Sequence, residues 1–169
     1  MLTLKDLQTD GSFGKFYGHP NGQDDSKGMV VRLLDEFGQS FAGIQALLTA
    51  AQIPVGLRTV PGVQTPIGTQ FVDANWLSRP NYPESGYQAD FGLEQQSRWL
   101  LVEIELSDHR RSVNSSFMRR AFLTAHLRLG IYILPEHTRL ENKRFYHHVT
   151  ERYNFHSPDY PLWVIGFDF

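Results

Sequence analysis

Two glutamates in the middle of the chain have a spacing that could support chemistry. Glu103 and Glu105 are separated only by Ile104 and follow the apolar run Trp99–Val102. Because side chains alternate across a strand, we expect both glutamates on one face and Ile104 on the other. Two like charges on one face repel each other unless something relieves them, and the candidates are an arginine, a metal ion or water.

A third carboxylate, Asp90, joins them if the chain folds back as a hairpin. The strands predicted for this hairpin are Tyr87–Phe91 and Arg98–Leu106. If the connecting loop is centred between Gln96 and Ser97, Asp90 stands directly opposite Glu103. The centre of the loop is an assumption, and a slip of one residue would break the arrangement.

Three carboxylates at one sheet edge match the ligands that hard divalent cations prefer. Mg²⁺ typically takes one or two carboxylates together with water and a substrate phosphate. Such a site can activate a bound water and neutralise charge on a phosphoryl oxygen. His109, Arg110 and Arg111 follow the glutamates and are candidates to hold the neighbouring phosphates. The alternative is a half-exposed strand that carries two solvated glutamates.

The composition is that of a globular protein, with 41% hydrophobic and 20% charged residues in a chain of 169. This length favours one domain with a substantial core. There is no cysteine, which excludes disulfides and thiolate chemistry. The first residues do not resemble a signal peptide, and no apolar run approaches the roughly 18 residues that span a bilayer, so we expect a cytoplasmic protein.

Charge is distributed unevenly along the chain. Residues 1–97 hold 10 acidic and 6 basic side chains, a net charge of −4, and residues 98–169 hold 8 acidic and 10 basic, a net charge of +2. Without Glu103 and Glu105 the second half would carry +4. Twelve of the 16 basic residues are arginine, which suits two-pronged contacts to phosphate, although genome composition explains the preference equally well.

The periodicity predicts a mixed α/β fold with a central mixed sheet flanked by helices. Residues 1–28 are expected to form a loop or arm, and residues 88–169 to hold the functional core. The elements expected between and within these parts are a helix over 29–52, short strands and turns over 53–68, a helix over 117–130, a strand over 131–134, a helix over 139–153 and a final strand over 161–169.

The order of these motifs resembles the PD-(D/E)XK nuclease core, and more narrowly the Bam/Bgl branch of type II restriction endonucleases. The matching segments are "YQADF", "LLVEIELSDHRRSVNSSFMRRAFLTAHLRLGIYILPEH" and "YPLWVIGFDF". The resemblance implies that Asp90 and Glu103 are metal ligands, with the Ile104 carbonyl as a further oxygen. Glu105 occupies the place of the superfamily's lysine, which leaves the general base open, and Ala89 stands where a proline is usual.

These observations together predict a Mg²⁺-dependent endonuclease that hydrolyses phosphodiester bonds of double-stranded DNA, in the manner of a type II restriction enzyme. In this hypothesis Asp90, Glu103 and Glu105 are catalytic. A homodimer is expected, because cutting both strands of a palindrome needs two centres related by a two-fold axis. The alternatives are a repair or toxin nuclease of the same core, a DNA-binding or assembly protein that kept the fold without activity, and an unrelated α/β domain with solvent-facing glutamates.

Overall fold

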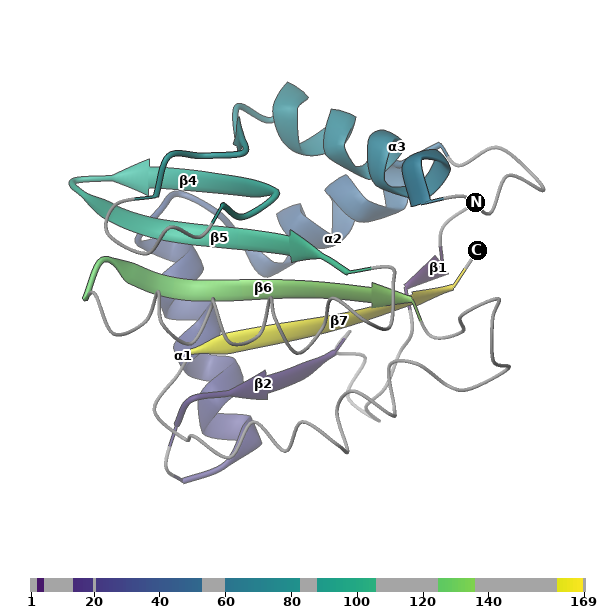
Figure 1. The fold of residues 1–169 in the computed structure, drawn as a ribbon. Coiled ribbons are helices and arrows are strands. Elements are labelled where there is room, and N and C mark those ends of the chain that lie inside the picture. Colours follow the sequence, from purple (N-terminus) through teal and green to yellow (C-terminus); the bar gives the residue numbers. More distant parts are fainter. Residues whose placement is uncertain are drawn as a thin grey trace.

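The computed structural model describes residues 3–4, 14–19, 21–52, 60–82, 88–105, 125–135 and 161–168. Its centre is a seven-stranded sheet in the order β1-β7-β6-β5-β4-β3, and β2 also pairs with β7 (Figure 1). The strands are β1 (Thr3–Leu4), β2 (Lys15–Tyr17), β3 (Leu77–Ser78), β4 (Phe91–Gln95), β5 (Arg98–Ile104), β6 (Leu127–Pro135) and β7 (Leu162–Asp168). The described helices are α1 (Gln23–Asp35), α2 (Phe41–Ala50) and α3 (Val60–Asp73).

The three central strands β5, β6 and β7 run parallel, and the outer pairings are antiparallel. Parallel strands that are buried on both faces read as nearly continuous apolar runs, which the sequence shows at Trp99–Val102, Ile131–Leu134 and Leu162–Ile165. The predicted strand over 131–134 and the final strand are therefore confirmed. The mixed α/β class with a central sheet is confirmed as well.

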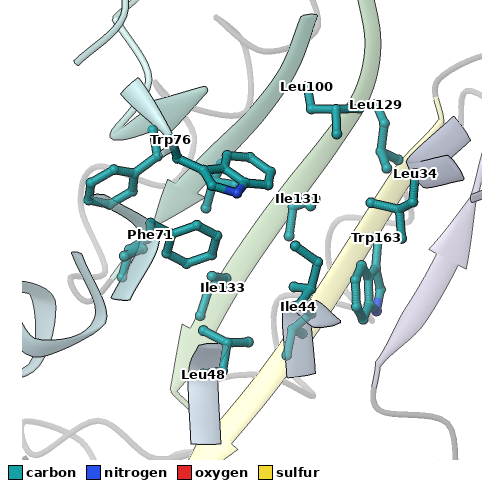
Figure 2. Close-up of a cluster of buried hydrophobic side chains, with 14 of the residues drawn as sticks. Leu34, Ile44, Leu48, Phe71, Trp76, Leu100, Leu129, Ile131, Ile133 and Trp163 are labelled. Atoms are coloured by element: carbon teal, nitrogen blue, oxygen red, sulfur yellow. The ribbon is translucent and has the colours of Figure 1, made fainter. Parts of the chain in front are cut away.

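The described helices pack on one face of this sheet, where they form the main core. Figure 2 shows Leu34 of α1, Ile44 and Leu48 of α2, and Phe71 of α3 against the sheet. The sheet residues that they meet are Leu100, Leu129, Ile131, Ile133 and Trp163. The members of this cluster on each central strand are spaced two residues apart, as the two-residue period of a strand requires.

The predicted helix over 29–52 is wrong in its extent, because two helices occupy the region. Gly38 has a left-handed backbone (φ 66°), and α2 begins after Ser40, whose hydroxyl accepts from the Gly43 N–H at 3.0 Å. A glycine followed by a capping serine is a usual signal for the end of one helix and the start of another. The expected arm also contains regular structure, since β2 and the first residues of α1 lie within it.

The short strands predicted over 53–68 are wrong where the structure describes this region. Residues from Val60 onward form α3, which holds Pro66 in its interior and buries Ile67 and Phe71. Proline, glycine and β-branched residues all have low helix propensity, so the local signal opposed a helix. Gly68 lies so close to Phe91 that an added Cβ would stand 2.8 Å from the ring tip, and this close packing favours the helix over local preference.

The predicted helix over 117–130 is wrong from Ala125 onward, which is where the structure describes the chain. Ala125 has a left-handed backbone (φ 61°), and β6 begins at Leu127. Gly130, the expected stop, pairs instead with Leu101 and Leu162 inside the sheet. The earlier part of this helix and the predicted helix over 139–153 lie outside the described residues.

Candidate active site

The hairpin of β4 and β5 sets the position of the carboxylates. Gln96 and Ser97 both have positive φ (51° and 59°), which matches the two-residue turn that favours tight hairpins. Phe91 pairs with Val102, and the register continues along the hairpin to Gln95 and Arg98. The predicted register is therefore confirmed, and its continuation by one pair places Asp90 opposite Glu103. The predicted strand boundaries are wrong, because residues expected in the loop form β4 itself.

Asp90 is held at the end of β4 by two hydrogen bonds from different elements. Its Oδ1 accepts from Nε2 of Gln64 on α3 at 3.0 Å, and its Oδ2 accepts from the backbone N–H of Ile104 at 2.8 Å. The carboxylate therefore bridges the helix layer and β5. Both bonds fix its orientation, so the half-buried side chain is positioned before any ligand arrives.

Burial raises the pKa of Asp90 above its ordinary range, and the nearby Glu105 charge raises it further. The Ile104 N–H, the Arg79 charge and the Gln64 amide each act in the opposite direction. Hydrogen-bond donors thus orient the ionised carboxylate of Asp90, but they do not offset the full cost of its burial and of the repulsion from Glu105. A cation placed between Asp90 and Glu105 would relieve both the desolvation and the repulsion.

Glu103 and Glu105 are buried, with only 6% and 3% of their surface exposed. Ile104 between them belongs to the core on the helix side, as predicted. Glu103 stands beside Tyr132 of β6, and the Glu105 N–H extends the pairing by donating to the Ile133 carbonyl at 3.0 Å. The alternative of solvated glutamates on a half-exposed strand is therefore wrong. Carboxylates are seldom buried this deeply unless they are paired or bind a metal.

The residues present fit a hard divalent cation that shares its ligands with a substrate. Within the described ranges, no three histidine, aspartate or glutamate side chains form a ready-made metal cage. Mg²⁺ needs fewer protein ligands, since one or two carboxylates with water and a phosphate suffice. Asp90 and Glu103, with the Ile104 carbonyl between the glutamates, offer that donor chemistry. Their assignment as metal ligands stays a prediction.

Other candidate residues separate into those outside the described part and those placed elsewhere. His109, Arg110 and Arg111 lie outside the described residues. Glu36, the residue that follows α1, lies at the opposite end of β5 from Asp90. There it pairs with Arg98 at 3.4 Å and with Arg128 at 3.2 Å.

Two residues that contact or act on Asp90 were not found from the sequence. Gln64 lies 26 positions earlier, on a helix that the sequence pattern did not indicate, and nothing marks it as a partner of Asp90. Arg79 follows β3 and donates its backbone N–H to the Asp90 carbonyl at 2.8 Å. The sequence around Arg79 carried no signal of this contact.

The sheet and the helices that cover it make up a restriction-endonuclease-like fold. The chain is similar to the crystal structure of restriction endonuclease BglII complexed with a DNA 16-mer, with a TM-score of 0.57 and 14% identity. The similarity covers 100% of this chain and 77% of that chain. No family model and no curated protein matches the sequence. No helix among the described residues is long and apolar enough to cross a membrane.

Proposed function

We propose that this protein is a Mg²⁺-dependent endonuclease of the PD-(D/E)XK type that hydrolyses phosphodiester bonds in double-stranded DNA, as a type II restriction enzyme does. The observation that carries the proposal is the placement of Asp90. It is oriented by Gln64 and Ile104 beside the buried Glu103 and Glu105, in a fold similar to that of a DNA-bound restriction endonuclease.

Each carboxylate has a distinct part in this proposal. Asp90 and Glu103 hold the metal with the Ile104 carbonyl, and Glu105 holds or orients the attacking water. Mg²⁺, when bound, supplies charge neutralisation at the phosphoryl oxygens and lowers the pKa of a bound water. The Gln64 amide and the Ile104 N–H keep Asp90 in its bridging orientation, so that little reorganisation is needed at the moment of reaction.

The proposed partner is double-stranded DNA, which is also what the structurally similar endonuclease is complexed with, and arginines would supply the phosphate contacts. His109, Arg110 and Arg111 follow β5 in the sequence and are proposed to bind phosphates next to the one that is cut. A homodimer would bring two such centres to the two strands of a palindromic site. Bound metal offsets the negative charge of the three carboxylates, so a chain of formal net charge −2 can bind DNA locally.

The test is incubation of the purified protein with unmethylated phage DNA in Mg²⁺ or in EDTA. We expect discrete fragments that require Mg²⁺ and disappear in Glu103→Gln, which keeps the shape of the side chain and removes its charge. Glu94→Gln is the matched control, because Glu94 lies on the same hairpin but is exposed. A smear instead of fragments would support nuclease chemistry and contradict restriction.

One observation favours a second candidate function, that of a DNA-binding protein without nuclease activity. Glu105 stands where the PD-(D/E)XK superfamily, which the sequence resembles, has a lysine that helps to activate water. A chain without that lysine could bind DNA without cutting it. That candidate predicts DNA binding without Mg²⁺ and no cleavage in any sequence context. Cleavage that depends on Glu103 would exclude it.

A further inference from the structure

Arg79 lies next to the carboxylates but outside every segment that the sequence linked to phosphate binding. β3 and β4 pair with Leu77 opposite Gly92 and Ser78 opposite Phe91. Continuation of this register by one pair puts Arg79 opposite Asp90. The hairpin register puts Asp90 opposite Glu103 in turn. Arg79, Asp90 and Glu103 are thus successive neighbours across three strands.

The backbone of Arg79 is fastened to the segment that carries Asp90. Its N–H donates to the Asp90 carbonyl at 2.8 Å, and its own carbonyl accepts from Nε2 of Gln88 at 3.2 Å. The residue has a left-handed backbone (φ 48°), which is uncommon for a side chain other than glycine, asparagine or aspartate. Such conformations cost free energy and persist where the surroundings hold them. The backbone of Arg79 is therefore held in place close to the carboxylates.

Arg79 is an exposed residue, and no carboxylate of the described residues lies within ion-pair distance of its guanidinium. Arg98 and Arg128, by contrast, both pair with Glu36 at the far end of β5. The charge of Arg79 nevertheless reaches Asp90, whose pKa it lowers. The backbone of Arg79 is thus held in place near Asp90 and Glu103, and its side chain forms no ion pair with another described residue.

We propose that Arg79 is a phosphate-binding residue of this site, whose guanidinium donates to two nonbridging oxygens of a DNA backbone phosphate adjacent to the one at Asp90. This inference rests on the proposed function. The planar guanidinium matches phosphate oxygens in a two-pronged geometry that an ammonium group cannot reproduce. A phosphate contact of this kind orients the DNA strand and carries no sequence information.

The test uses the full-length protein with the Glu103→Gln change, which prevents cleavage, in the presence of Mg²⁺. Binding of a short duplex of mixed sequence is measured over a range of salt concentrations, with and without Arg79→Gln. Loss of one phosphate contact is expected to lower the slope of log K against log salt by about 0.9 and to weaken binding several-fold at low salt. Arg79→Lys is expected to keep the slope, because the charge remains, and to bind less tightly than arginine.

Arg32→Gln is the matched control, since Arg32 is an exposed arginine on α1 without an ion pair among the described residues. Its salt slope should equal that of the parent. An unchanged slope in Arg79→Gln, with the parent binding in a salt-dependent way, would overturn the inference and leave the proposed function standing. An unchanged slope together with a shifted pH–activity profile in the otherwise unaltered protein would show that Arg79 acts on Asp90 alone, which also overturns it. Failure of the parent to bind DNA at all would overturn both proposals.

Discussion

Replacement of Gln64 by leucine tests whether the site is oriented by the hydrogen bond between Gln64 and Asp90. The change removes the donor 3.0 Å from Asp90 Oδ1 and leaves the Ile104 N–H as the remaining donor to the carboxylate among the described residues. Hydrogen bonds to metal-binding carboxylates are typically worth about 10- to 100-fold in metal affinity. Because Asp90 keeps its second bond, we expect the lower end, about 10-fold weaker Mg²⁺ binding.

This loss has a measurable thermodynamic consequence. At a Mg²⁺ concentration about 100 times the dissociation constant, the parent gains about 2.7 kcal/mol of unfolding free energy from the bound ion. A 10-fold weaker site gains about 1.4 kcal/mol under the same conditions, as follows from RT ln(1 + [L]/Kd). Thermal unfolding with and without Mg²⁺ gives both values, and a Mg²⁺ titration of cleavage should move by the same factor.

A pH profile separates an effect on Asp90 from a general structural defect. The Gln64 bond lowers the pKa of Asp90, so its loss raises that pKa further above the ordinary range. Since the ionised carboxylate binds the cation, the acid limb of the cleavage profile should move to higher pH. Gln70→Leu is the control, because Gln70 lies on the same helix and its side chain makes no hydrogen bond among the described residues. Equal Mg²⁺ dependence and equal pH profiles in the two variants would refute the reasoning.

Two further predictions concern the framework of the site. In Gly68→Ala the new Cβ would lie 2.8 Å from the Phe91 ring, which stacks on Phe71, so we expect a loss of about 1–3 kcal/mol of unfolding free energy by denaturant titration. Gly28→Ala, whose Cβ has room, should instead be neutral or stabilising, and equal stability of both variants would contradict the packing argument. Burial raises the pKa of Tyr17 to about 12. Tyrosine in the unfolded chain ionises near pH 10, so stability is full below that pH and falls by up to roughly 3 kcal/mol as pH rises through 12. Tyr17→Phe should remove this part of the slope, and identical slopes would show that Tyr17 does not contribute.

The relative position of Asp90 and Glu103 could be predicted from the sequence, because it depends on the turn of the β4–β5 hairpin. The strand boundaries of the hairpin were wrong by several residues, yet the predicted register holds from Phe91–Val102 to Gln95–Arg98, and its continuation by one pair places Asp90 opposite Glu103. The reason is that the register of a two-stranded pair depends only on where the turn is centred, and the assumed centre between Gln96 and Ser97 agrees with the positive φ angles of these two residues. Errors at the outer ends of the strands leave the register unchanged.

The helix layer could not be predicted in the same way, because its signals are not local. α3 contains residues of low helix propensity, and what favours the helix is burial of Ile67 and Phe71 and the close approach of Gly68 to Phe91. That approach exists only after β4 has formed. Gln64 reaches Asp90 through the same packing, so the hydrogen bond that orients the carboxylate had no counterpart in the sequence pattern.

The position of Asp90 also joins the stability of the sheet to the chemistry of the site. Its Oδ2 accepts the Ile104 N–H, a bond that in a continuing ladder would go to a carbonyl of a neighbouring strand. An alanine at position 90 would remove the metal ligand and at the same time leave that N–H without its acceptor, which costs about 1–3 kcal/mol for a buried group. An asparagine keeps an acceptor oxygen for Ile104 and removes the charge, while its Nδ2 takes the place of Oδ1, so the Gln64 amide has to turn over and accept through its Oε1. Loss of cleavage in Asp90→Asn with an intact fold would therefore report on the chemistry, whereas the same loss in Asp90→Ala would combine chemistry with local damage to β5.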